Sequence, residues 1–280
     1  MPVPSVDHAV INVLYDMDAA ADVFRALGFH LTPRGFHSLG SINHLMMFGQ
    51  DYLELVGLPT GTDKIRREVA DSPRGLNGLV FLTEDADAEY TRLLAAGVPT
   101  ELPLAFGRPV DLDGTTQEAK FRTVRLKPGF VQGGRVYFCE QRTRHLVWRP
   151  EWQSHANGAV AIAGFTVVVP DPAAEARRYA TVLGQTAATR SAGTATLRLG
   201  DFALELMTSD AYLDRYGDQA FRPEGREAYM GAVTLRTTSL ADVDACFAAA
   251  RDHGIACRRD GARATVSASS AFDSVIAFIE

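Results

Sequence analysis

The sequence has 280 residues, more than one domain usually contains, and 46% of them are hydrophobic, enough to form buried cores without structural metal. Its formal net charge of −6 argues against nucleic acid and anionic membranes as partners, because both require a basic face, and leaves small neutral or cationic ligands open. The three cysteines lack zinc-type spacing, no apolar run reaches membrane length, and no signal peptide begins the chain, so we expect a cytoplasmic protein.

The first structural unit that the pattern predicts covers residues 5–57. Residues 7–13 alternate in polarity, which predicts a strand with His8 on one face. Residues 19–27 carry apolar side chains at three-to-four spacing before Gly28, which predicts a short amphipathic helix. Three strand-like runs separated by turn residues follow, at 29–32, 43–48 and 51–56. The unit is therefore strand, helix, strand, strand, strand (βαβββ).

The same order of elements recurs in three more copies, which begin near residues 76, 161 and 231. Their helices also stop at glycine, and the last strand of each copy carries a glutamate, at Glu54, Glu140, Glu205 and Glu280. Aligning the glycines Gly28 and Gly97 brings Asn77 onto the position of His8, where the later copies have Gly164 and Gly231. A single copy cannot close its own hydrophobic face, so neighbouring copies must pair.

The stretch between the second and third copies contains two tryptophans, a proline and an Asn-Gly turn. We predict an N-terminal domain over 1–148, a packed linker over 149–158 and a second domain over 159–280. The fold class is α+β: each domain pairs two βαβββ units around a cupped, mostly antiparallel sheet with helices outside.

Four short motifs carry a family resemblance: Asp7-His8-Ala9-Val10-Ile11, Gly28-Phe29, Gly40-Ser41-Ile42-Asn43-His44 and Tyr52-Leu53-Glu54-Leu55. In this order they resemble the vicinal oxygen chelate superfamily, most closely its glyoxalase-like domain proteins, over residues 5 to about 158. The second half is similar through its βαβββ periodicity alone. The superfamily includes glyoxalase I, extradiol dioxygenases, fosfomycin-modifying enzymes and bleomycin-binding proteins. The resemblance implies two tandem domains of the vicinal-oxygen-chelate type.

The resemblance also implies a divalent metal in the cup, held by the first and last strands of each copy. The matching positions are His8, Glu54, Asn77 and Glu140, and Asn77 departs from the family pattern, where His, Gln or Glu is usual. We therefore expect His8, Glu54 and Glu140 to bind Fe, Mn, Ni, Co or Zn. The open coordination positions would take a small molecule with vicinal oxygens, and Glu140 or Glu54 would shuttle a proton. This implies a metal-dependent isomerase, lyase or ring-cleaving dioxygenase.

Arg108, in a predicted loop over 106–117, is the expected substrate contact, with His44 beneath it. The alternative is a metal-free protein that sequesters an aromatic or cationic compound, as bleomycin-binding relatives do, with Phe48, Tyr52 and Tyr137 as stacking faces. If the repeat is left out of account, His8 is more typical of a core or surface histidine than of a metal ligand. The second domain lacks the histidine, so we expect it to be structural or to mimic a dimer partner; a homodimer also stays open.

Overall fold

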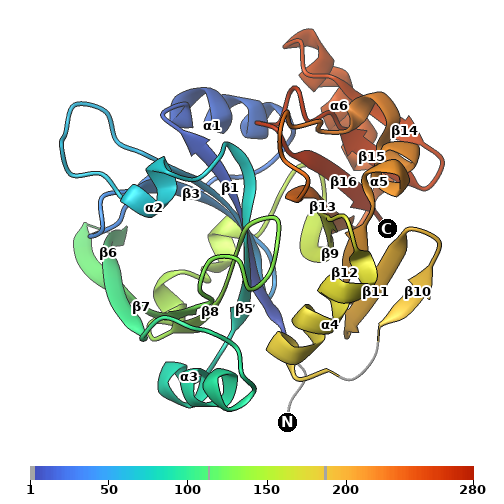
Figure 1. Ribbon diagram of the computed structural model, residues 1–280. Coiled ribbons are helices and arrows are strands. Elements are labelled where there is room, and N and C mark those ends of the chain that lie inside the picture. The colour runs from blue at the N-terminus through green and yellow to red at the C-terminus, as the bar shows by residue number, and fades with distance from the viewer. Residues whose placement is uncertain (1–3, 113, 186–187) are drawn as a thin grey trace.

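The computed structural model describes residues 4–112, 114–185 and 188–280. Two eight-stranded sheets form, one from each half of the chain (Figure 1). The order strand, helix, strand, strand, strand occurs four times along the chain. The predicted α+β class, with four βαβββ units in two tandem domains, is confirmed.

The first sheet has the strand order β2-β3-β4-β1-β5-β8-β7-β6. Its first unit consists of β1 (Val6–Leu14), α1 (Met17–Ala26), β2 (Gly35–Phe36), β3 (Ile42–Met47) and β4 (Tyr52–Gly57). Its second unit consists of β5 (Gly75–Leu82), α3 (Ala86–Ala95), β6 (Leu104–Leu112), β7 (Thr115–Arg125) and β8 (Arg135–Gln141). The short helix α2 (Arg67–Ala70) connects the units, and the 3-10 helices η1 (Arg144–Leu146) and η2 (Pro150–Trp152) follow them.

The predicted loop over 106–117 is wrong, because these residues belong to the β6–β7 hairpin. Pairing runs from Leu104 opposite Thr123 to Leu112 opposite Thr115. Gly114, at φ +80°, turns the chain, while Asp113 lies outside the described residues. The Gly-Arg-Pro run resembled a loop, but β6 is the edge strand of the sheet, where proline is tolerated, and it pairs with β7, which is rich in Thr, Phe and Val.

The second sheet repeats the order of the first, as β10-β11-β12-β9-β13-β16-β15-β14. Its first unit consists of β9 (Ala159–Val168), α4 (Pro172–Leu183), β10 (Thr189–Ser191), β11 (Thr194–Leu199) and β12 (Phe202–Met207). Its second unit consists of β13 (Tyr229–Thr237), α6 (Leu240–Asp252), β14 (Cys257–Asp260), β15 (Arg263–Val266) and β16 (Val275–Ile279). Between them lie α5 (Ser209–Tyr216) and η3 (Gly217–Gln219).

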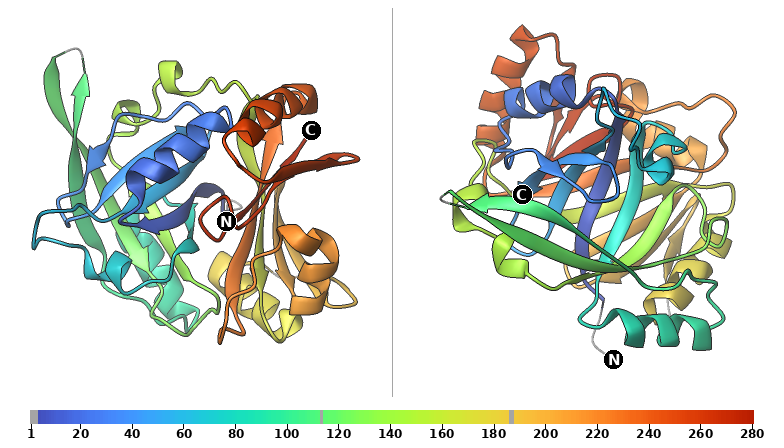
Figure 2. Two further views of the ribbon diagram at one scale, coloured as in Figure 1. Left: turned by 90° about the horizontal axis from the view of Figure 1, so that it is seen from above. Right: turned by 90° about the vertical axis from the view of Figure 1, so that its left-hand side faces the viewer.

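The two sheets and their outer helices share one apolar core. The rings of Phe29 and Phe278, from opposite ends of the chain, lie 5.9 Å apart in it. Helix α1 lies beside α6 (Figure 2), and Arg92 of α3 donates to the carbonyl of Val182 in α4 at 2.6 Å. Each sheet keeps a separate, smaller apolar cluster on its other face. Those other faces are the two cups.

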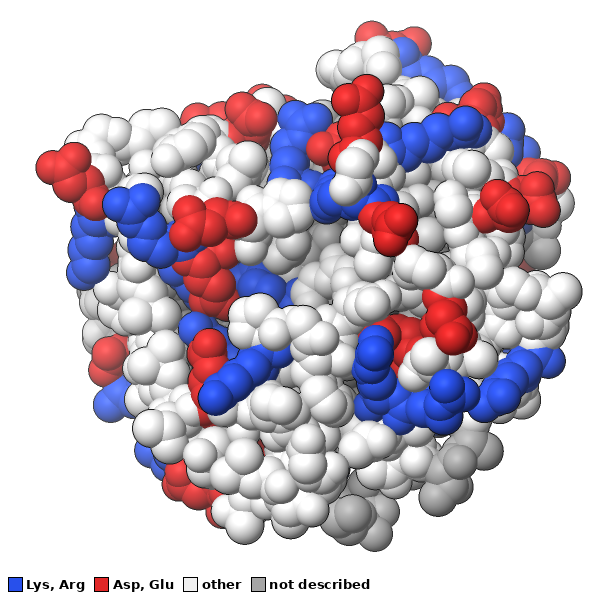
Figure 3. Space-filling view, viewed as in Figure 1, with Lys and Arg blue, Asp and Glu red and all other residues white. Residues whose placement is uncertain are grey.

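Charged side chains of both signs are interspersed over the face seen in Figure 3. None of the described helices combines the length and the apolar composition that a bilayer-spanning helix requires.

A buried carboxyl group connects the two halves. Oδ1 of Asp51, just before β4, accepts a hydrogen bond from the backbone N–H of Ile162 in β9 at 2.9 Å. Burial raises the pKa of Asp51 from 3.8 to about 7, so the folded protein holds a proton there that the unfolded chain has already lost. This group therefore lowers the free energy of unfolding as the pH rises from about 4 to about 7.

We predict that Asp51→Asn, which keeps the acceptor oxygen and removes the charge, melts at least about 2 °C above the wild type at pH 8. The gain should disappear near pH 4, where Asp51 is neutral. Thermal melts at both pH values test this, with the exposed Asp63→Asn as control. A variant no more stable than the wild type at pH 8 contradicts it.

Candidate functional site

The cup of the first sheet encloses a small cavity of about 30 Å³, enough for one or two water molecules. The imidazole, amide, carboxylate and guanidinium groups that line it are those of His8, His37, Asn43, Glu54, Arg66 and Arg108. They come from β1, β3, β4, β6 and the segments before β3 and α2.

The Asp7–His8 pair is made by a β-bulge. Val6 pairs with Phe81 and His8 with Val80, so Asp7 is an extra residue in β1. The bulge brings the fully buried Asp7 carboxylate beside the imidazole, and its Oδ2 accepts from His8 Nδ1 at 2.6 Å. The same oxygen accepts from Gln141 Nε2 at 2.8 Å. Because the carboxylate can only accept, the proton lies on Nδ1 and Nε2 faces the cavity.

Three side chains surround His8. Its Nε2 lies 3.7 Å from Glu54 Oε2 and 3.4 Å from the Tyr137 hydroxyl. The Tyr52 ring stacks on the imidazole at 4.4 Å, with the planes 11° apart. Burial raises the pKa of the Tyr137 hydroxyl, which is therefore neutral at physiological pH.

Glu54 is held in its ionised form. Burial alone would raise its pKa, but His8, His37 and a 2.7 Å hydrogen bond from Asn43 Nδ2 outweigh burial and lower it. Burial lowers the pKa of His37 to about 4, so that imidazole is neutral at pH 7.

Arg108, on β6, is the unbalanced charge of the cup. The residue is only 5% exposed, and its Nη2 has no hydrogen-bond partner. Among the described residues no carboxylate oxygen lies within 4 Å of its guanidinium group. Burial lowers the pKa of Arg108, although a guanidinium group stays charged in proteins. A buried, unpaired cation is costly unless a ligand supplies the anion.

The structure thus brings His8, Glu54, Tyr52, Tyr137 and Arg108 to one cavity, as the sequence predicted, but Glu140 does not join them. Side chains alternate along β8, so Tyr137 and Cys139 line the cup while Glu140 faces away. Glu140 Oε2 accepts from the backbone N–H of Ala86 at the start of α3, at 3.1 Å. Its Oε1 accepts from Arg142 at 2.7 Å. Val10 pairs with Glu54 in the first unit and Val80 pairs with Tyr137 in the second, so Tyr137 rather than Glu140 occupies the position of Glu54.

Asn77 is also displaced from its predicted position. Val10 pairs with Gly78 and Ile11 with Leu76, so Asn77 is the bulge residue of β5 and corresponds to Asp7. Its Oδ1 accepts from Arg135 Nε at 2.8 Å. The residue that matches His8 is consequently Gly78.

His44 and Phe48, expected to contact the substrate, both point away from the cup. His44 Nδ1 donates to the Thr32 carbonyl at 2.7 Å, and its neighbour Leu45 is the residue that lines the cavity. Phe48 packs in the shared core, edge-on to His155 at 5.3 Å. Alternation along β3 explains His44, and the chain has left the strand before Phe48.

These positions decide how well the cup fits a resident metal. Of the four ligand positions implied by the family, the first unit supplies His8 and Glu54, and the second supplies Gly78 and Tyr137. Among residues 4–112, 114–185 and 188–280, no group of three or more His, Cys, Asp and Glu side chains converges as metal ligands would. The predicted three-ligand set of His8, Glu54 and Glu140 is not assembled, and the donors present do not fit a metal with three protein ligands.

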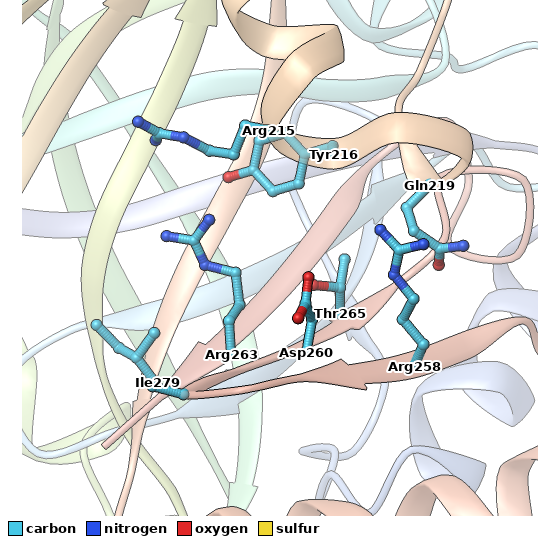
Figure 4. A pocket seen from close by; sticks show the side chains of 9 residues that line it. Arg215, Tyr216, Gln219, Arg258, Asp260, Arg263, Thr265 and Ile279 are labelled. Atoms are coloured by element: carbon cyan, nitrogen blue, oxygen red, sulfur yellow. The ribbon is translucent and has the colours of Figure 1, made fainter.

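The second cup is filled by its own chain. Tyr212 and Tyr216 of α5 insert into its apolar cluster. Glu205, which matches Glu54, is bound by Arg215 of the same helix at 2.6 Å. What remains is a pocket of about 380 Å³ at the mouth, where Arg215 and Arg263 lie on either side of the Tyr216 hydroxyl (Figure 4).

Comparison with known proteins agrees with this architecture. The family model described as glyoxalase-like domain matches residues 6–183, more than half of the chain. The chain belongs to this family. No curated protein matches the sequence. We therefore rely on the cup itself to infer the chemistry of this glyoxalase-like protein.

Several solved structures resemble the whole chain in fold. A hypothetical protein from Staphylococcus aureus has a TM-score of 0.67 at 12% identity, covering 99% of both chains. A variant of 4-hydroxymandelate synthase from Streptomyces coelicolor has a TM-score of 0.58 at 12% identity, covering 100% of this chain and 93% of its own. A xylose isomerase-like TIM barrel/4-hydroxyphenylpyruvate dioxygenase fusion protein has a TM-score of 0.59 at 14% identity, covering 100% and 50%. At these identities the likeness extends to the fold alone.

We predict that Glu140 stabilises α3 and does not act in the cup. Glu140→Ala should lower the free energy of unfolding by about 1 kcal/mol, as loss of an N-terminal helix acceptor does. Glu280→Ala should have a similar effect, because Glu280 accepts from Leu240 N–H at the start of α6 at 2.8 Å. Denaturant melts measure both, with the exposed Glu84→Ala as control. Two variants as stable as the wild type contradict the prediction.

Proposed function

We propose that the N-terminal cup binds a small organic acid and moves a proton on it. Arg108 holds the carboxylate of the ligand, and His8 is the acid–base group. The observation that carries this proposal is the unpaired, 5% exposed guanidinium group of Arg108 in the same cavity as a histidine whose Nε2, 3.4 Å from the Tyr137 hydroxyl, faces that cavity.

The groups around His8 have complementary roles in proton transfer. With Nδ1–H bound to Asp7, Nε2 carries the electron pair that takes a proton from a carbon or oxygen of the ligand. The imidazolium so formed lies between the carboxylates of Asp7 and Glu54, which stabilise its charge. The neutral Tyr137 hydroxyl, 3.4 Å from Nε2, can donate to an oxygen where negative charge develops. This arrangement supports an isomerase or lyase.

The metal-dependent reaction on vicinal oxygens that we expected has weaker support from the same residues. His8 Nε2 and Glu54 Oε2, 3.7 Å apart, are close enough to share an ion, but the second unit adds neither histidine nor carboxylate. No step of the proposed reaction therefore depends on a metal. Sequestration of an aromatic cation also has weaker support, because His8 covers Tyr52 and Phe48 lies in the core.

The cavity has room for only one or two waters, so the ligand must displace lining side chains on entry. Arg66, whose guanidinium carbon lies 5.9 Å from the centre of the Phe106 ring, forms part of this lining. Since Phe106 belongs to the β6–β7 hairpin, an outward movement of that hairpin would open the cup.

We predict that at least one acid in a panel of 2-oxo and 2-hydroxy carboxylates raises the melting temperature by about 2 °C or more. Arg108→Gln should abolish this shift, because it removes the cation that pairs with the carboxylate. His8→Gln should retain it but lower turnover of that acid at least about 100-fold. The exposed Arg198→Gln is the control. Undiminished ligand binding by Arg108→Gln would refute the proposal.

We further predict that Mn(II), Fe(II), Co(II), Ni(II) and Zn(II) each raise the melting temperature by less than about 1 °C, since two donors bind an ion weakly. Protein purified without added metal should hold less than one equivalent. Elemental analysis and thermal melts measure this. A stoichiometric ion that is lost in His8→Ala would restore the metal-dependent hypothesis.

A further inference from the structure

Three arginines surround one carboxylate next to the cup. Glu68, on α2, lies 2.7 Å from Arg66 Nη2, 3.0 Å from Arg125 Nη1 and 3.0 Å from Arg135 Nη1. The arginine side chains are 12%, 15% and 18% exposed, respectively. We refer to Arg66, Arg125 and Arg135 as the arginine cluster.

The arginine cluster carries more positive charge than its surroundings neutralise. Three guanidinium groups against one carboxylate leave an excess of two charges, and in the described chain no other carboxylate lies within 4 Å of them. Nε and Nη2 of Arg125 and Nη2 of Arg135 have no hydrogen-bond acceptor. Like charges held together away from water repel strongly. An anion with several acceptor oxygens would neutralise the excess positive charge and also accept hydrogen bonds from the unpaired nitrogens.

A large pocket lies against the cluster. Its volume is about 680 Å³, within the usual range for small-ligand sites, and Arg135, Glu68 and Lys127 line it. Asp71 and Glu227 also line it, but neither pairs with an arginine of the cluster. Arg66, on the other side of Glu68, lines the cavity of the cup. The cluster therefore connects the open pocket with the cup.

We propose that the arginine cluster binds a phosphate group. A phosphate monoester carries close to two negative charges at pH 7 and three terminal oxygens, which match the excess charge and the three unpaired nitrogens. The next step rests on the proposed function, in which Arg108 holds the carboxylate of the ligand. With the arginine cluster holding a phosphate, the substrate of the cup is a phosphorylated carboxylic acid.

Glu68 provides a substitution that should strengthen anion binding. Its carboxylate occupies the centre of the cluster and competes with an incoming anion for the same N–H groups. Burial would raise its pKa, but the three arginines outweigh burial and lower the pKa to about 2, so Glu68 is ionised at neutral pH. Removing this charge strengthens binding of an anion, whereas a purely structural cluster would only lose stability.

The experiment measures binding of inorganic phosphate to the full chain by calorimetry, at constant ionic strength set with sodium chloride. We expect Glu68→Gln to bind phosphate at least about threefold more tightly than the wild type, and Arg135→Gln at least about fivefold more weakly. The matched control is Arg258→Gln, since Arg258 lines the pocket of Figure 4 but has its own partner, Asp218, at 2.9 Å. It should bind phosphate as the wild type does. Arg135→Lys replaces Arg135→Gln if the latter does not fold, with the same direction.

Three results would overturn the proposal: no saturable binding in either the wild type or Glu68→Gln, equal weakening in Arg258→Gln, or tighter binding of malonate than of phosphate. The second would mean an adventitious ion only, and the third a site for dicarboxylates. Arg108→Gln should leave phosphate affinity unchanged, so the phosphate site and the proposed chemistry of the cup can fail independently.

Discussion

Burial of one face of each sheet in a single shared core decides which residues reach the cups. Because side chains alternate along a strand, the residues that pack into this core, such as Leu53 and Phe138, assign their neighbours Glu54 and Cys139 to the cup. A one-residue shift would exchange the two sets and bury a carboxylate in the core. The register of β1, β4, β5 and β8 is thus fixed by apolar packing, and the site depends on that register.

Periodicity predicted the fold because the hydrophobic pattern of each βαβββ unit changes from the strand period to the helix period and back. The pattern of one unit is a weak indication, but its recurrence in four units in the same order is a strong one. The family resemblance, the predicted stacking faces and the assignment of Arg108 together named five residues that line one cavity in the structure, His8, Glu54, Tyr52, Tyr137 and Arg108. Bulges account for the main failures. Each first strand contains at least one extra residue, and a regular strand pattern cannot show it.

The bulge explains why Asp7 was missed and Asn77 misassigned. In a regular strand Asp7 and His8 would point to opposite faces, so the polarity pattern did not indicate that they pair. Glu140 was misassigned for a related reason: a glutamate ends all four copies, but Glu54 and Glu205 face cups, whereas Glu140 and Glu280 accept from helix N-termini. Glutamate near the end of each of the four repeats therefore has two different physical roles.

The net charge of the chain and the local charge around the first cup favour different ligands. The chain is acidic overall, with a formal charge of −6, which had suggested neutral or cationic ligands. Yet the local balance around the first cup is positive, since Arg108 and two charges of the arginine cluster lack partners. Coulomb interactions weaken steeply through water and strongly favour the groups that are buried together. The anionic ligand that we propose therefore follows from four largely buried arginines and not from the exposed carboxylates, whereas in the second cup Glu205 neutralises Arg215.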